Sequence, residues 1–237
     1  MSFTTTTHDD HDHGHGHGPA VEGAENPGGH HEPAELRDHK ERLALWMFIA
    51  GDALFLILMV FTWFYLRTLN SNGMWDAAQC STANPCEDGL GNPILAQITR
   101  ADPWHAVIIA ACTVLAAGFV WLAEIGAKKN TTKAAISAPA GMAFLFMVLA
   151  IAMQIYQFQV LPFTTIDGAY ASTYEFFMGS TLAHLLILAF VGLGLWIRST
   201  RGRHAGGTWY RVRLIRFFAV WVALSTVILT VVGALFA

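Results

Sequence analysis

Five long runs of apolar residues, separated by polar segments, dominate the sequence. A helix that rises about 1.5 Å per residue needs about 20 apolar residues to cross the roughly 30 Å of hydrocarbon in a bilayer. Every run reaches this length, and together they predict membrane-spanning helices at 43–67, 104–126, 137–160, 174–199 and 213–236. We therefore expect an all-α, polytopic membrane protein whose five-helix bundle covers residues 37–237.

The segment before the first span has a different composition. Residues 1–36 are rich in Gly, His, Asp and Glu and contain almost no large apolar side chain, so we expect a disordered tail without an apolar signal-peptide segment. Five of its histidines lie among aspartates in a pattern that suits weak binding of a divalent metal ion: His8, His11, His13, His15 and His17. The alternative is a solvated tail without a metal role, which the lack of packing residues favours.

The composition of the chain agrees with a membrane protein. Hydrophobic residues make up 54% and charged residues 13% of the 237 residues, and the mean hydropathy is +0.43. This is too apolar for an ordinary soluble domain of that length. Nothing in the charge pattern supports nucleic-acid binding.

The basic residues are concentrated on one side of the predicted spans. All of the 14 lysines and arginines except Arg67 and Arg100 lie before the first span, between the second and third, or around the link between the fourth and fifth. Positive residues face the cytoplasm in membrane proteins. We therefore expect a cytoplasmic N-terminus, a C-terminus outside, and a place in a bacterial cytoplasmic membrane.

Two polar residues are expected near the middle of the bilayer. Asp52 lies about 13 Å along the first span, at a rise of about 1.5 Å per residue, and His184 lies at a similar depth in the fourth. A charged side chain at this depth costs about 2.5–3.5 kcal/mol on insertion scales, so we expect Asp52 to be protonated or hydrogen-bonded, and we predict a hydrogen bond to His184. The carboxyl is either proton-linked or lipid-contacting, or it is a polar clasp between helices.

Other polar residues are expected near the ends of the spans. We place Glu175 at the outer interface and Glu124 at the inner one, where solvation costs little. Gln154 and Tyr156 come at the outer end of the third span, among lipid headgroups. The i, i+3 spacing of Gln154 and Gln157 also allows a bond to a neighbouring helix.

Positive charge at the start of the fifth span predicts contacts outside the bundle. We expect Arg211, Arg213 and Arg216, with Trp209 beside them, to meet lipid headgroups or carboxylates of a partner.

The three cysteines are interpreted by their location. Cys80 and Cys86 lie in the long link after the first span, which we place outside, where a disulfide can persist. Spacing alone does not decide whether they are bonded. Cys112 lies within the second span and is most simply a small apolar residue.

Several segments resemble subunit III of the cytochrome c oxidase family. The first span, LWMFIAGDALFLILMVFTWFYLR, resembles the family pattern F-I-x-S-E-x-x-F-F, with Asp52 on its buried glutamate and Gly51 on its serine. The entry to the fourth span, DGAYASTYEFFM, is similar to the family's D-G-x-Y-G-S-T-F-F-M. Further matches come from FVWLAEIG, MQIYQF and TWYR, at Trp121, Gln154, Tyr156, Trp209 and Tyr210.

The resemblance covers roughly residues 43–236 and implies a function. It implies a non-redox accessory subunit of a haem–copper respiratory oxidase that oxidises cytochrome c, reduces oxygen to water and pumps protons. The haems and copper would lie in subunits I and II, and this chain would pack on subunit I and bind phospholipid. Family members commonly have seven helices, so this chain resembles the shorter bacterial forms with five.

Two other functions are considered. A subunit-III-like accessory protein of nitric oxide reductases would share the same bundle. A stand-alone metal transporter with a His-rich cytoplasmic tail would need converging ligands within the membrane, and the sequence has few residues there to supply them.

Overall fold

The computed structural model describes residues 34–69, 75, 86–87, 93–94, 101–129, 132–165, 168–202 and 209–235. Five helices account for nearly all of this part of the chain: α1 (Ala34–Leu69), α2 (Pro103–Lys128), α3 (Lys133–Val160), α4 (Ala169–Thr200) and α5 (Trp209–Thr230). Each contains a segment long and apolar enough to cross a membrane, so the chain is a multi-pass membrane protein. The predicted all-α fold class is confirmed.

Two short elements interrupt this pattern. Strands β1 (Cys86–Glu87) and β2 (Pro93–Ile94) form a small antiparallel ladder in the link between α1 and α2. The π-helical turn η2 (Val231–Leu235) continues α5. Neither adds a layer to the helical architecture.

Helix α1 begins earlier than the sequence pattern predicted. It starts at Ala34, so residues 34–36, which we assigned to the disordered tail, are helical. The reason lies in the local sequence. Pro33 precedes the helix, Ala34 and Leu36 are strong helix formers, and Glu35 lies in the first turn near the positive end of the helix dipole.

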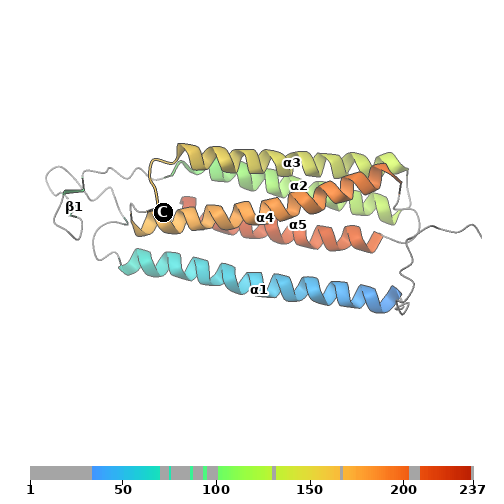
Figure 1. Cartoon of the computed structure of the whole chain (residues 1–237), viewed down its shortest axis with the longest axis horizontal. Coiled ribbons are helices and arrows are strands. Elements are labelled where there is room, and N and C mark those ends of the chain that lie inside the picture. The colour runs from blue at the N-terminus through green and yellow to red at the C-terminus, as the bar shows by residue number, and fades with distance from the viewer. Residues whose placement is uncertain are drawn as a thin grey trace, which may run out of the picture.

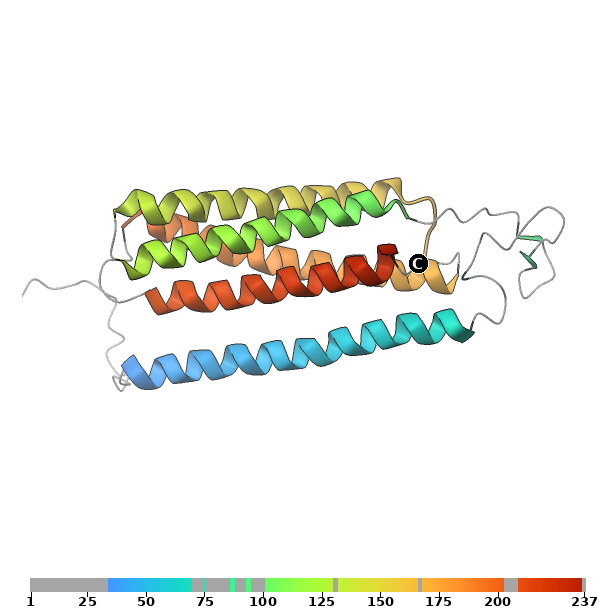
Figure 2. The same cartoon turned by 180° about the vertical axis from the view of Figure 1, so that it is seen from behind.

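Helices α2 to α5 form a four-helix bundle, and α1 lies alone along one side of it, next to α4 and α5 (Figures 1 and 2). Consecutive helices run in opposite directions. We call the end of the bundle that holds Lys128 and Thr200 the proximal end. The end that holds Leu69 and Ala169 is the distal end.

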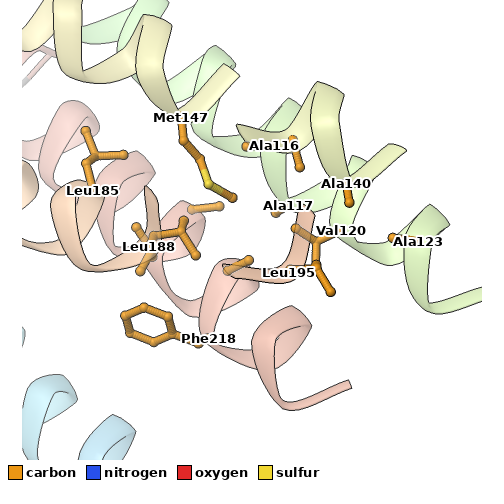
Figure 3. Close-up of a cluster of buried hydrophobic side chains, with 14 of the residues drawn as sticks. Ala116, Ala117, Val120, Ala123, Ala140, Met147, Leu185, Leu188, Leu195 and Phe218 are labelled. Atoms are coloured by element: carbon orange, nitrogen blue, oxygen red, sulfur yellow. The ribbon is translucent and has the colours of Figure 1, made fainter. Parts of the chain in front are cut away.

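The core of the four-helix bundle is built on small residues. Figure 3 shows Ala116, Ala117 and Ala123 of α2 and Ala140 of α3 in one cluster with larger side chains from α4 and α5. Small side chains let helix backbones approach closely, which is the main source of helix attraction in lipid. The backbones of α2 and α3 come close together at Gly126, where a Cβ atom would lie 2.7 Å from the backbone oxygen of Ala135.

An aromatic cluster joins α1 to the bundle at the distal end. The ring of Trp63 is fully buried. Its centroid lies 4.8 Å from the ring of Trp75 and 5.0 Å from that of Phe177, and Tyr170 packs against both tryptophans. Edge-to-face and offset stacking at these distances is favourable.

Most other side chains of α1 point away from the bundle. Apolar and aromatic residues that are more than half exposed occur along its whole length: Leu43, Trp46, Met47, Leu54, Ile57, Leu58, Phe61, Tyr65 and Leu69. A helix that is apolar all round is suited to a surface in contact with lipid or with other apolar helices. Helix α1 is therefore the least enclosed element of the described structure.

Candidate functional site

The side chains of Asp52, His184 and Trp221 meet between α1, α4 and α5. Nε2 of His184 lies 3.0 Å from Oδ1 of Asp52, and Nε1 of Trp221 donates a hydrogen bond of 2.6 Å to Oδ2. The other imidazole nitrogen, Nδ1, lies 2.8 Å from the backbone oxygen of Ser180, one turn earlier in α4. The contact between Asp52 and His184, which we predicted from their shared depth, is confirmed.

These contacts determine where protons lie. A backbone carbonyl only accepts, so Nδ1 of His184 must carry the proton that bonds Ser180. The contact between Nε2 and Oδ1 of Asp52 then needs one further proton, held either by the imidazole or by the carboxyl. In both cases the pair as a whole is neutral, which explains how a carboxyl group is tolerated at this depth.

The side chains of the pair are mostly, but not completely, shielded from solvent. The side chains of Asp52 and His184 are each 13% exposed. The pair fastens α1 to α4 and, through Trp221, α1 to α5.

The sequence alone does not identify Trp221 as a hydrogen-bond partner of Asp52. It lies in an apolar span, where an indole usually packs against lipid or other helices, and no spacing rule links it to a residue 169 positions earlier. The only available signal was chemical, because a buried indole N–H normally finds an acceptor.

A second polar cluster lies at the proximal end and corrects our interpretation of Glu124. The side chain is 1% exposed, so it is not solvated at the interface as we expected. Its two carboxylate oxygens each lie 3.0 Å from a cation, Nζ of Lys128 and Nε of Arg216. Helix α5 packs against α2 here, so Arg216 reaches across and covers the carboxylate.

Arg216 is therefore engaged within the chain rather than only with lipid or a partner. Its guanidinium also lies over the rings of Phe217, at 4.6 Å, and Trp121, at 5.9 Å. Such contacts between a cation and an aromatic face add to the ion pair when both are shielded from water. The cluster locks the start of α5 onto the end of α2.

Two glutamines of α3, Gln154 and Gln157, face inward. Gln154 and Gln157 are each 2% exposed, so Gln154 does not lie among headgroups as we expected. Nε2 of Gln157 donates to the hydroxyl of Tyr174 in α4 at 2.8 Å, which confirms the predicted bond to a neighbouring helix. Tyr156 is half exposed and its ring contacts that of His105 at 5.5 Å.

The remaining predicted residues are placed as follows. Glu175 is half-buried near the distal end. Nε of Arg211 donates to the hydroxyl of Tyr210 at 3.1 Å, and Arg213 lies 5.6 Å from the ring of Phe217. Both arginines are half-buried at the proximal end, at the level where we predicted headgroup contacts.

Some predictions lie outside the described residues. These are the metal binding of the tail histidines, the bond between Cys80 and Cys86, and the contacts of the Trp209 side chain. Cys112 is a free, half-buried thiol. In the part of the chain that the structure covers, no group of three or more His, Cys, Asp or Glu side chains is placed to hold a metal ion.

No protein-family model matches the sequence, and no curated protein is detectably similar to it. The residues and their geometry are therefore the basis for assigning a function.

Proposed function

We propose that this chain is a non-redox accessory subunit of a haem–copper respiratory oxidase, of the subunit III type. The observation that carries the proposal is the partly buried pair of Asp52 and His184. The carboxyl lies at the position where the sequence resembles the family's buried glutamate, and its partner comes from the helix that begins within the DGAYAST segment. The helix that supplies His184 thus begins in a second stretch of the resemblance, while His184 itself lies outside the matched residues.

The exposed face of α1 supports a role within a larger complex. Apolar side chains along this helix are left uncovered by the rest of the described chain. In a membrane such a face meets lipid or other apolar helices. We assign it to contact with a larger neighbouring subunit, subunit I, and with phospholipid held between the two.

The charge distribution supports an orientation. Lys128 and Lys133 lie at the proximal end, together with Arg211 and Arg213. By the positive-inside rule we assign this end to the cytoplasm of a bacterial cell. Anionic headgroups of the cytoplasmic leaflet would then meet the arginines at the start of α5.

In this proposal the chain supports the chemistry of its neighbours. The haems and copper of subunits I and II would oxidise cytochrome c and reduce oxygen. The pair of Asp52 and His184 would hold α1 in place against α4 and α5. No electron-transfer step is assigned to this chain.

Co-purification tests the proposal directly. The chain, tagged at its C-terminus and extracted in a mild detergent from its own membrane, should bring down a large membrane subunit with haem absorbance and cytochrome c oxidation. Co-purification with nitric oxide reductase activity would instead favour a subunit-III-like accessory protein of a nitric oxide reductase. A colourless preparation that contains this chain alone would overturn the proposal.

A further inference from the structure

Two cavities lie near the distal end of the four-helix bundle. The first has a volume of about 30 Å³ and is lined by residues of α2, α3, α4, α5 and η2. The second, of about 160 Å³, lies between the start of α2 and the end of α3, next to Asp102 and His105. The side chain of Gln157 lines both.

Polar side chains converge on the first cavity from three helices. Gln154 and Gln157 come from α3, Tyr174 and Thr181 from α4, and Thr226 and Thr230 from α5. So many polar groups around one space in an apolar bundle are unusual, since a polar side chain inside a membrane protein is costly unless it is hydrogen-bonded.

Several of these groups have unused hydrogen-bonding capacity within the described part of the chain. Other buried threonines, such as Thr113 and Thr226, bond a carbonyl of their own helix, whereas the hydroxyl of Thr181 has no such bond there. The Gln154 amide makes one long contact, 3.4 Å from its nitrogen to Oε1 of Gln157. The hydroxyl oxygen of Tyr174 accepts from Gln157, which leaves its own proton available to a further acceptor.

We propose that the first cavity is a water site, which holds about two water molecules that hydrogen-bond Thr181, Gln154 and Tyr174. Its volume of about 30 Å³ exceeds the roughly 10–15 Å³ that one water needs by this measure, and a buried water needs two to four polar partners. The lining side chains carry no formal charge, so water fits better than a cation.

Gln157 forms the partition between this site and the second cavity. Its bond to Tyr174 holds the amide between the two spaces. Water would therefore enter from the distal end, past Asp102 and His105, and exchange when the Gln157 amide swings aside.

Radiolytic labelling tests the water site, because X-ray pulses convert a bound water into hydroxyl radical that oxidises its immediate neighbours. Three buried methionines give an internal comparison. Met178 lines the cavity and is 5% exposed, whereas Met59 and Met147 do not line it and are 3% and 0% exposed. In the full-length chain in lipid nanodiscs we expect Met178 to be oxidised several-fold faster than both. Equal rates at the three methionines would overturn the proposal.

Variants distinguish bound water from bulk solvent. Thr181→Val with Gln154→Leu removes two partners of the water, so oxidation of Met178 should fall by about tenfold, the change expected for two lost hydrogen bonds. Thr113→Val is the matched control, because this hydroxyl bonds its own helix and lies outside the cavity, and it should leave the rate unchanged. An unchanged Met178 rate in the double variant would overturn the proposal.

The partition is tested with ¹⁸O-labelled water. After rapid mixing, the delay before ¹⁸O appears on oxidised Met178 reports the exchange of the buried water. Gln157→Ala should shorten this delay. A delay that stays the same would contradict the assigned role of Gln157.

Discussion

At the scale of single residues, the bundle accommodates buried acids in two different ways. Asp52 and His184 form a pair that is neutral whichever group holds the shared proton. Glu124 instead stays close to two cations, Lys128 and Arg216. The first arrangement suits the middle of a membrane, and the second suits its edge, where basic residues are already gathered.

The coupling between Asp52 and His184 is measurable in a double-mutant cycle. Replacing either residue alone with leucine removes the bond between them and leaves one polar atom of the partner without it, which should lower the free energy of unfolding by about 1–3 kcal/mol. The double variant should lower the free energy of unfolding by less than the sum of the two single variants, because the effects of substitutions at contacting residues are not additive. Unfolding in mixed micelles provides the measurement, and strictly additive costs would contradict a direct bond.

Glu124→Gln removes the charge that two cations share. The two cations left behind are 46% and 19% exposed and remain partly solvated, so the free energy of unfolding should fall by about 1–3 kcal/mol, less than for a fully buried pair. Glu41→Gln is the control, since this partly exposed carboxyl has no ion pair within the described residues, and it should have little effect. If both variants unfold at the same denaturant concentration, the cluster does not stabilise the fold.

At the scale of helices, two kinds of contact hold the molecule together. Helices α2 and α3 approach closely along small residues, whereas α1 is attached through an aromatic cluster and one polar network. This difference follows from side-chain volume. Alanine and glycine allow backbones to meet, but the large side chains of α1 keep its axis away from the bundle.

Gly126→Ala should disturb the contact between α2 and α3. The added Cβ would lie 2.7 Å from the backbone oxygen of Ala135, and backbone cannot move aside as a side chain can. We expect a loss of about 1–3 kcal/mol, as for other overpacked sites, and a lower Tm in detergent.

Gly118→Ala provides the comparison on the same helix. No atom lies within 4 Å of the Cβ that it would add, and alanine is the better helix former. This variant should be neutral or slightly stabilising. Equal destabilisation by both substitutions would mean that the close contact between Gly126 and Ala135 is not the cause of the lost stability.

At the scale of the whole molecule, the proximal and distal ends differ in chemistry. The proximal end carries most of the cations, and the distal end carries the aromatic cluster and the polar cavities. This difference between the two ends would set the orientation of the bundle in the membrane, because positive residues favour the cytoplasmic side.

The orientation is tested by thiol labelling in a background without native cysteines. Lys129 and Thr164 are exposed at the proximal and distal ends. With an impermeant reagent on intact cells, Thr164→Cys should be labelled and Lys129→Cys should not, and inverted vesicles should show the reverse. Labelling of Lys129→Cys from outside would overturn the assigned orientation.

The sequence by itself determined the fold class, because span length and apolar composition depend only on the local chain and the thickness of a bilayer. It also placed Asp52 and His184 at the same depth, since rise per residue is constant in a helix. Tertiary structure alone brought Trp221 to Asp52, buried Glu124 under Arg216 and turned Gln154 inward. These outcomes depend on the rotation of each helix about its axis and on which helices become neighbours. The hydrophobic pattern carries little information on either when a helix is apolar on every side.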